Sequence, residues 1–569
     1  RKDLIDNMGA DALQAVDAAI NYDPTTEAAT PPEAGGVGEE ASEGDDEEII
    51  EVGDENKLVD PATDKLLDRL LHQGVIPRYA FPTDVVAFHV LNPNTSTAFR
   101  NQIEFAPTQG LTLALSQYAP NKQIWIKNNQ YTCKAVYSPY PGERRRAWGK
   151  RELYFECTVC SHAATDAYSD ARRNTTENCP ACQSATFGPA RVWFRPTGFA
   201  HLIDRPPTNQ PDQPNETAFA TRAKLVMQTP GRDKPFVAVS ARVRAYPARE
   251  FLLVSNTGPD QDGYNYCLEC GRIEAVADME ENIFQPHARP YRSDEEGLCQ
   301  GPTASHVVLG TDFRTDIALF SLPLDAPFRA APGSDEAASA LRTVCEALAK
   351  AACNLLEIEA GEILAEFRPA LNDAGARGEE AEVFLYDTLA GGAGFSTQLV
   401  DRGPALFKEA MRILTTCPDA CDASCYRCLR SFRNKLEHGL LDRQLGAQFL
   451  EHAMRGGYPA YPADRTERSL DLFVADLRRQ FSAEFTFERN AARTDSTAGS
   501  ITVPIVAIRR SSNAETWVCL SSPLAAAVPT DPAMQGLSAA GRAKIECADD
   551  LVVRFNLPEA SLALHSALR

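Results

Sequence analysis

Three groups of four closely spaced metal-ligand residues constrain this chain more than any other feature of its sequence. The first group consists of two Cys-x2-Cys pairs, Cys157 with Cys160 and Cys179 with Cys182. Such pairs form tight knuckles that face each other around a tetrahedral zinc ion. Because a shell of four thiolates leaves no open position for water, the spacing predicts a structural zinc ribbon rather than a catalytic site.

The second group is less complete in sequence, because the pair Cys267 and Cys270 has no second pair downstream. Candidates for the remaining two ligands are Cys299, His287 and His306. A shell of three cysteines and one histidine is ordinary for structural zinc. We predict Cys267, Cys270, His287 and Cys299, with His306 as the alternative to His287. The other reading of either histidine is an exposed loop residue.

The third group is the densest, with Cys417, Cys421, Cys425 and Cys428 inside a dozen residues. Four thiolates so close together need a cation between them, either zinc or an iron–sulfur cluster. The last three cysteines match the radical-SAM spacing, but that family carries its motif at the first strand of a barrel, whereas this one follows a predicted helix. We therefore predict zinc. Structural zinc contributes about 10–16 kcal/mol in small modules, so the metal-free form should lose this part of the fold.

A run of basic residues follows the third group. It contains five candidate DNA contacts: Arg427, Arg430, Arg433, Lys435 and Arg443. A zinc knuckle that leads into a basic helix is a plausible phosphate-contacting surface. The alternative is a solvated helical face that pairs with the chain's many acids, and the sequence leaves both open.

A glycine-rich turn follows the apolar strand predicted at Glu382–Tyr386. Asp387 and then Gly391-Gly-Ala-Gly-Phe395 could cradle a phosphate on backbone N–H groups, although no Lys-Ser or Lys-Thr follows to make a P-loop. Asp387 with Asp312 and Asp316 could also form an acidic metal centre of the nuclease kind. Capping within a tight turn explains the same residues.

Charge and hydropathy place limits on function. The formal net charge of −21 argues against a histone-like binder of nucleic acid, although much of it comes from an acidic run at 39–55. We expect no membrane span, because no apolar stretch approaches about 20 residues. We also expect no signal peptide, because the chain opens Arg-Lys-Asp-Leu with no initiator Met and no apolar h-region. The sixteen cysteines then indicate a reducing, cytoplasmic location, where thiols hold metal or lie buried. The opening without Met predicts the downstream part of something longer.

The stretch from Leu309 to Arg443 resembles the MrfA-like zinc-binding domain found behind superfamily 2 helicase motors. The resemblance rests on Leu309-Gly-Thr-Asp-Phe-Arg-Thr-Asp316, on the Asp387 turn, and on Cys417…Cys421…Cys425-Tyr-Arg-Cys428-Leu-Arg-Ser-Phe432. It implies that the four cysteines are zinc ligands. The upstream motifs Ile76-Pro-Arg-Tyr-Ala-Phe-Pro82 and Ala106-Pro-Thr-Gln109 look like the connecting region of large antiphage helicases of the DISARM and Druantia kind.

We expect an α+β multidomain chain. Its predicted parts are a helical end of an upstream domain at 1–22, an acidic disordered linker at 23–58, a β-rich connector domain at 59–150, a zinc-ribbon region with two zinc sites at 151–308, an α/β MrfA-like zinc-binding domain at 309–460 and a small α/β C-terminal domain at 461–569. The predicted helices are 2–20, 63–71, 336–356, 404–414, 442–453 and 469–481. The predicted strands are 84–91, 112–117, 123–127, 130–136, 316–320, 363–367, 382–386, 500–508 and 516–520, with Asn128-Asn129 as a hairpin turn.

These features give two main hypotheses. The first is the non-motor C-terminal module of a DNA helicase or translocase in antiphage defence, which grips single-stranded or forked DNA and keeps its shape with three structural zinc ions. No GxxxxGK[ST], Asp-Glu-x-His or superfamily 2 arginine motif occurs, so ATP would enter only through a motor absent from this chain. That motor would act in cis, which the start without Met favours, or in trans, beside other defence-system subunits. The second hypothesis is a zinc-stabilised scaffold that docks a separate motor without touching DNA.

Overall fold

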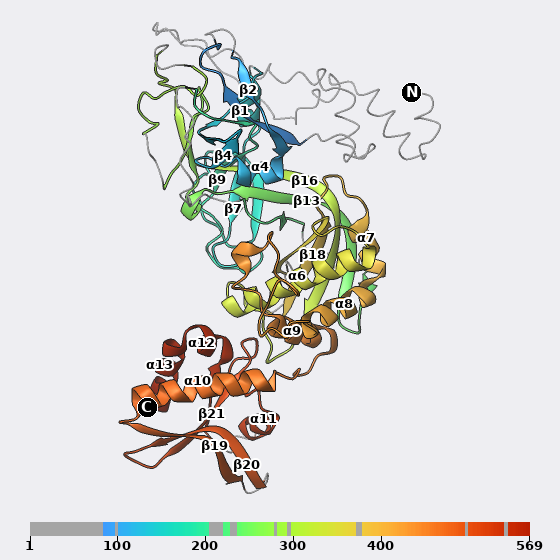
Figure 1. Ribbon diagram of the computed structural model, residues 1–569, viewed down its shortest axis with the longest axis vertical. Coiled ribbons are helices and arrows are strands. Elements are labelled where there is room, and N and C mark those ends of the chain that lie inside the picture. Colours follow the sequence, from blue (N-terminus) through green and yellow to red (C-terminus); the bar gives the residue numbers. More distant parts are fainter. Residues whose placement is uncertain are drawn as a thin grey trace, which may run out of the picture.

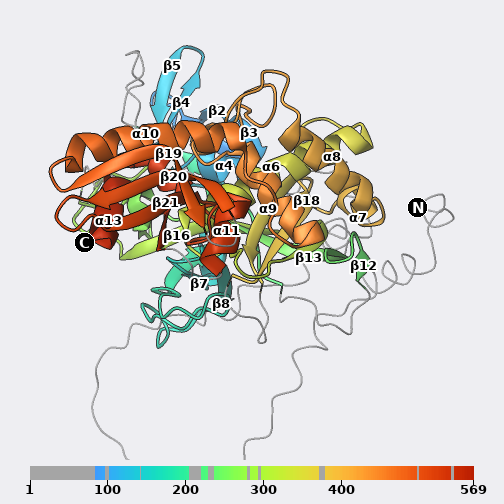
Figure 2. The ribbon, with the colours of Figure 1, turned by 90° about the horizontal axis from the view of Figure 1, so that it is seen from below.

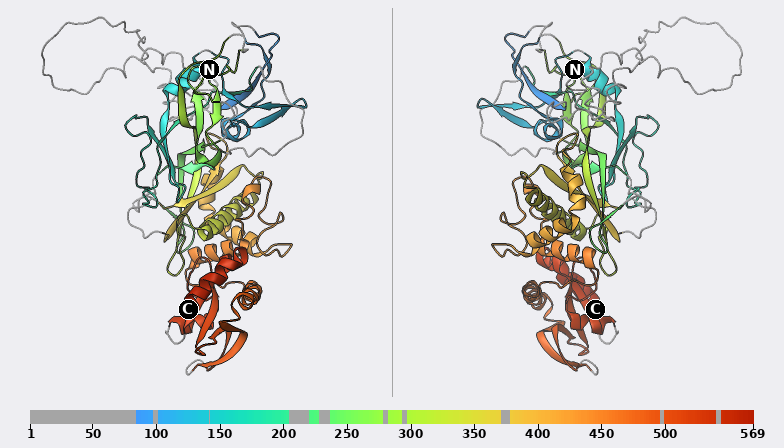
Figure 3. Two further views of the ribbon diagram at one scale, coloured as in Figure 1. Left: turned by 90° about the vertical axis from the view of Figure 1, so that its left-hand side faces the viewer. Right: turned by 90° about the vertical axis from the view of Figure 1, so that its right-hand side faces the viewer.

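We describe the fold from a computed structural model (Figure 1). The structure describes residues 84–96, 101–140, 142–203, 220–227, 236–277, 282–292, 297–370, 378–495, 499–539 and 544–569. The predicted helices at 2–20 and 63–71, the acidic linker and the motif at 76–82 lie outside these ranges. The described residues form an elongated body with a β-rich end, an α/β middle and the C-terminal segment at the far end, an arrangement that the side views repeat (Figures 1 and 3).

One long strand connects the β-rich end to the α/β middle. β16 (Thr303–Pro323) pairs antiparallel with β13 (Arg244–Asn256), parallel with β9 (Arg191–Phe194) near its start, and antiparallel with β18 (Glu380–Asp387) near its end. The same sheet contains β7 (Glu152–Glu156), β8 (Ala163–Ala167), β11 (Lys224–Leu225), β12 (Val237–Ala238), β14 (Tyr264–Cys267), β15 (Ile273–Ala275) and β17 (Ile363–Pro369). β16 runs without a break through residues 308 and 309, where we predicted the boundary between the zinc-ribbon region and the MrfA-like domain.

Alternate residues of this sheet contribute to two different cores, as the twofold period of a strand requires. On one face, Val383 and Leu385 pack beneath α6 (Asp335–Leu356), α8 (Gly403–Thr415) and α9 (Arg443–Arg455). On the opposite face, Phe384 and Tyr386 join the core of the β-rich end. Ser334 caps the N-terminus of α6, because its hydroxyl accepts a hydrogen bond of 3.2 Å from the Ala337 N–H.

The β-rich end contains a second sheet. β1 (Val85–Leu91) pairs with β2 (Ile103–Phe105), β3 (Thr108–Gly110) and β10 (Phe199–Ala200), and β10 pairs with β6 (Ala135–Val136). The strand predicted at 112–117 is wrong, because these residues belong to the helix α4 (Leu111–Gln117). Leu111, Ala114 and Leu115 are buried at helical spacing while Leu113 is 51% exposed, so the true period is that of a helix.

The predicted hairpin in this region is present, but its turn is displaced by one residue. β4 (Gln123–Ile126) and β5 (Asn129–Thr132) are connected by Lys127 and Asn128, which both have positive φ. The prediction placed the turn at Asn128-Asn129. The structure assigns Asn129 to a strand, and the segment predicted as one strand at 130–136 divides into β5 and β6. α5 (Glu143–Gly149) follows the hairpin.

The C-terminal segment is a four-stranded sheet with helices on both faces (Figure 2). The sheet order is β19 (Phe485–Asp495), β20 (Gly499–Arg509), β21 (Glu515–Ser521) and β22 (Ile545–Asp549). α10 (Ala463–Phe481), α12 (Asp550–Phe555) and α13 (Leu557–Leu568) share one core with it, and α11 (Pro532–Ala539) covers other strand residues. These elements confirm the predicted helix at 469–481 and the strands at 500–508 and 516–520.

The observed class is mixed α/β with several sheets, as predicted. The helices predicted at 336–356, 404–414 and 442–453 and the strands at 84–91, 363–367 and 382–386 are all present, while the strand at 316–320 is one part of β16. The limits between domains stay predictions. Among the described residues, no helix has the length and apolar character needed to cross a bilayer.

Candidate metal centres and the adjoining basic loop

The fold brings each predicted ligand set together. Within each set the four ligand atoms lie within 4.8 Å of one another, and these are the three such groups of potential metal ligands in the described residues. Cluster 1 is Cys157, Cys160, Cys179 and Cys182; cluster 2 is Cys267, Cys270, His287 and Cys299; cluster 3 is Cys417, Cys421, Cys425 and Cys428. Four donors around one point leave no open coordination position, which is the pattern of a structural site.

Cluster 1 has the spacing expected around a single zinc ion. The Sγ atoms of Cys157 and Cys182 are 3.5 Å apart, and those of Cys160 and Cys179 are 3.6 Å apart. Zn–S bonds of about 2.3 Å in a tetrahedron would place neighbouring sulfurs about 3.8 Å apart. The donor set and its dimensions therefore fit zinc.

The Cys-x2-Cys knuckles of clusters 1 and 2 share a backbone turn that the sequence did not reveal. The residue directly after the second cysteine has positive φ and donates its N–H to the carbonyl oxygen of the first. These residues are Ser161, Gln183 and Gly271, with N–H to oxygen distances of 2.9, 2.8 and 2.9 Å. Only Gly271 is of the residue type that signals a left-handed turn, so the other two turns could not be predicted from residue type.

The second cluster resolves the choice between two histidines in favour of His287. Its Nε2 lies 3.3 Å from Sγ of Cys270, and its Nδ1 lies 2.8 Å from the Gln285 carbonyl oxygen. Donation of the Nδ1 proton to that carbonyl leaves Nε2 free to bind metal, as in most zinc-bound histidines. His306 is exposed, and its Nδ1 contacts the Asp262 carbonyl oxygen instead.

Cluster 3 also has single-ion dimensions. Sγ of Cys417 is 3.6 Å from that of Cys425, and Sγ of Cys421 is 3.6 Å from that of Cys428. Cysteines of a four-iron cluster bind separate iron atoms and would stand farther apart, so this spacing favours zinc over iron–sulfur. The Cys425 N–H donates to the Cys428 sulfur at 3.1 Å, a contact that stabilises a thiolate.

The environment of cluster 1 lowers the pKa of Cys157 and Cys179 and raises that of Cys160 and Cys182. The pKa of Cys179 falls to about 5, chiefly because the Cys160 thiol donates a hydrogen bond to it. The pKa of Cys160 rises for the same reason. Because zinc binds thiolates, such a site is partly prepared for the ion at neutral pH.

The segment that contains Cys428, the last ligand of cluster 3, and continues past it is a loop, not the basic helix that the sequence predicted. Residues 426–438, which we name the basic loop, contain turns and one short 3-10 turn at Lys435–Glu437. The Ser431 N–H donates to Asn434 Oδ1 at 2.8 Å, and the Asn434 N–H donates to Ser431 Oγ at 3.4 Å. These side chains occupy the backbone donors that a helix would use.

The five predicted DNA contacts fall into two groups. Arg427, Arg433 and Lys435 are exposed. Arg430 instead donates to Ser424 Oγ at 2.9 Å, and Arg443 donates to the carbonyl oxygens of Cys421 and Leu414 at 2.7 and 3.0 Å. The last two side chains therefore support cluster 3 and the end of α8.

Exposed apolar side chains on the basic loop were missed in the sequence. Tyr426 is 68% exposed, Phe432 is 78% exposed and Leu436 is 70% exposed. The Lys435 ammonium lies 4.7 Å from the centre of the Phe432 ring. Burial and then the charge of nearby Lys435 lower the pKa of Lys122, so the basic loop lies close to the β-rich end.

The glycine-rich turn binds the chain's own carboxylates. Asp387 accepts from the N–H groups of Ala393, Phe395 and Ser396 at 2.7, 3.1 and 2.8 Å. Asp316 accepts from the Gly394 N–H at 3.1 Å, while Asp312 is exposed. The donors that could have cradled a phosphate are thus occupied. The structure supports the capping alternative over both the phosphate cradle and the acidic metal centre.

Comparisons with known proteins agree with this geometry. The family model for the MrfA Zn-binding domain matches residues 344–429, which include cluster 3. Druantia protein DruE of Escherichia coli is 29% identical over 420 residues, which are 70% of this chain and 22% of that protein. The chain therefore spans about a fifth of the length of this curated relative.

Similar solved structures include the DUF1998 helicase MrfA bound to DNA, at 11% identity and a TM-score of 0.33, covering 66% of this chain and 34% of that one. MrfA in a further structure gives a TM-score of 0.24 at 11% identity, covering 63% and 34%. Likeness at this level carries no conclusion about this chain. The family model and DruE confirm the resemblance seen in the sequence: residues 344–429 match the MrfA Zn-binding domain, and the chain is similar to DruE over 420 residues.

Proposed function

We propose that this chain is the non-motor module of a DNA helicase or translocase in bacterial antiphage defence, and that it grips single-stranded or forked DNA. One observation carries the proposal: the basic loop presents Arg427, Arg433 and Lys435 beside the exposed rings of Tyr426 and Phe432. Cations bind the phosphate backbone, and exposed aromatic rings stack on unpaired bases. The relation to a Druantia protein supports the defence context.

The loop is held firmly enough to present these groups. Asn434 at its centre is only 2% exposed, and its amide donates to Glu346 on α6 at 2.8 Å and to the Leu429 carbonyl at 3.0 Å. Its N-terminal end is fixed by Cys425 and Cys428 of cluster 3. Structural zinc, bound by the twelve ligands of clusters 1 to 3, would hold these parts in shape, and it takes no part in chemistry.

In this proposal, the motor activity comes from a part that is not in this chain. The chain has no Walker A sequence, so hydrolysis of ATP would come from a motor in cis or in trans. A scaffold that docks this motor without DNA is the second candidate. It is favoured by exposed apolar side chains on the C-terminal helices, namely Leu472, Phe555 and Leu562, at 56%, 66% and 55%. Isolated exposed apolar residues are common on protein surfaces, so this observation weighs less.

The test is a titration of labelled forked DNA with the zinc-loaded chain over a salt series. We expect the logarithm of affinity to fall linearly with the logarithm of salt concentration. Arg427→Ala with Lys435→Ala should reduce the slope by about 1.4, because each contact to a single strand contributes about 0.7. Arg455→Ala is the matched control, since this side chain is 75% exposed on α9 and pairs only with Glu451 in the described residues. If the chain does not bind forked DNA even at low salt, the DNA-gripping proposal is refuted and the scaffold is the remaining candidate function.

A further inference from the structure

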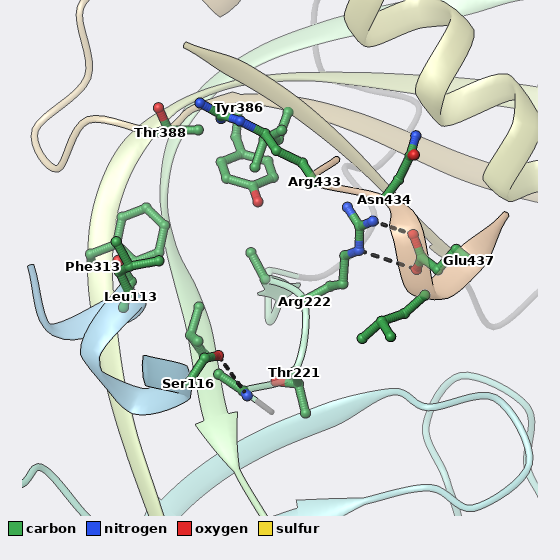
Figure 4. A pocket seen from close by; sticks show the side chains of 16 residues that line it. Leu113, Ser116, Thr221, Arg222, Phe313, Tyr386, Thr388, Arg433, Asn434 and Glu437 are labelled. Carbon is green, nitrogen blue, oxygen red and sulfur yellow. Dashed lines mark hydrogen bonds and ion pairs between the residues drawn. The ribbon is translucent and has the colours of Figure 1, made fainter. Parts of the chain in front are cut away.

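A cavity of about 460 Å³ lies directly beside the basic loop (Figure 4). Its walls come from α4, from β13 and β16, from β17 and β18, and from the loop itself. This volume is within the range of about 300–1,000 Å³ typical of small-ligand sites. The cavity joins segments that are more than 300 residues apart in the sequence, so no sequence pattern could reveal it.

The cavity wall is largely apolar. Among its apolar lining residues, Val254 and Phe313 are buried, and Leu113 and Leu436 are exposed. The charged residues Arg222 and Glu437 also line it, but they form an ion pair with each other and so are not available to a ligand. A flat, mostly apolar group fits this wall.

The polar groups of Tyr386 and Arg433 in the cavity wall are available to a ligand. Tyr386 is only 5% exposed, yet its hydroxyl has no hydrogen-bond partner among the described residues, and Figure 4 shows it directed into the cavity. The hydroxyl oxygen is open to the cavity, so it can form a hydrogen bond with a group that enters. The Arg433 guanidinium likewise has no partner within the described part of the chain. It lies against Gly361, where any Cβ atom would displace it.

We propose that this cavity takes one unpaired nucleobase of a DNA strand that lies on the basic loop. The base would lie against Phe313 and Leu113 and accept a hydrogen bond from the Tyr386 hydroxyl, and its phosphate would pair with Arg433. Charge complementarity supports this occupant, because Arg433 lines the cavity and exposed Lys435 lies two residues further along the same loop. The inference rests on the proposed function and adds the substrate class: DNA with at least one base free of its partner.

The experiment compares two oligonucleotides with equal numbers of phosphates, one of thymidine and one fully abasic, bound to the full zinc-loaded chain. We expect the thymidine strand to bind about tenfold more tightly. Tyr386→Phe should reduce that preference about threefold and leave the salt slope unchanged, because only a hydroxyl is lost. Leu113→Glu should abolish it, whereas Leu562→Glu, an equally exposed leucine on α13, should have no effect.

The outcomes separate this inference from the proposal that precedes it. Equal binding of both strands with a normal salt slope would overturn the base site and leave the DNA grip intact. Failure of both strands to bind at low salt would overturn both. Saturable binding of free thymidine monophosphate that Tyr386→Phe weakens, and that the oligonucleotide does not compete away, would show that the occupant is a free nucleotide and refute the strand assignment.

Discussion

Arg465 on α10 connects the C-terminal segment to cluster 3, and its removal gives a sharp prediction. The side chain is 1% exposed and donates to both Asp442 carboxylate oxygens at 3.0 and 2.8 Å. It also donates to the carbonyl oxygen of Asp422, which lies between Cys421 and Cys425, at 2.6 Å. Arg465→Met keeps most of the aliphatic stem and removes the charge.

The free-energy cost of Arg465→Met depends on the buried Asp442 carboxylate that the substitution leaves behind. Removing one partner of a buried ion pair costs about 3–5 kcal/mol, because the other charge is left buried. Asp442 retains Arg554 at 2.8 Å, so we expect the lower end of this range, about 3 kcal/mol. At about 1.4 kcal/mol for each factor of ten, the opening equilibrium of α9, whose N-cap is Asp442, should rise by about two orders of magnitude.

Hydrogen exchange measured by mass spectrometry reads this opening directly from the α9 amides. A chromogenic chelator measures the accompanying release of zinc from cluster 3, which should quicken. Arg468→Met is the control: this side chain also bonds to Asp422 but is 56% exposed, so its loss should cost at most about 1 kcal/mol. If Arg465→Met lowers the hydrogen-exchange protection of the α9 amides no more than Arg468→Met does, the buried Arg465–Asp442 ion pair does not stabilise α9.

Three further predictions follow from the described contacts. Elemental analysis should find three zinc ions per chain, one for each cluster, and Cys421→Ser should reduce the content to two. Gly392→Ala should lower the melting temperature, because φ there is +71° and the added Cβ would collide with the Asp316 carboxylate; unchanged melting would contradict this. Burial opposes ionisation of Asp442, but Arg465 and Arg554 outweigh it and hold its pKa below the ordinary value. The stability from this pair should therefore be complete above the unfolded pKa of about 3.9 and be lost as pH falls through the lower folded value, and acid titrations of Asp442→Asn should lack this component.

Cluster 1 and cluster 3 could be found from the sequence because their ligands are local. A Cys-x2-Cys pair closes one backbone turn, and cluster 3 lies within a dozen residues, so spacing alone predicts which atoms converge. The same applies to α6, whose N-cap and long apolar face are encoded in neighbouring residues. Helix α4 failed as a prediction because seven residues are too few to separate a period of 3.6 from a period of 2.

The histidine ligand of cluster 2, the shape of the basic loop and the cavity beside it depend on long-range contacts that only the tertiary structure shows. The sequence favoured His287 but left His306 as the alternative, and the antiparallel bridge between His287 and Cys299 brings His287 to cluster 2. The basic residues after cluster 3 look helical in sequence, yet Ser431 and Asn434 close them into a loop against α6. The cavity that the Tyr386 hydroxyl faces forms where α4, strands of the large sheet and the basic loop pack together. Sequence spacing determines groups that one turn can join, whereas packing of distant segments determines which polar groups remain available for a ligand.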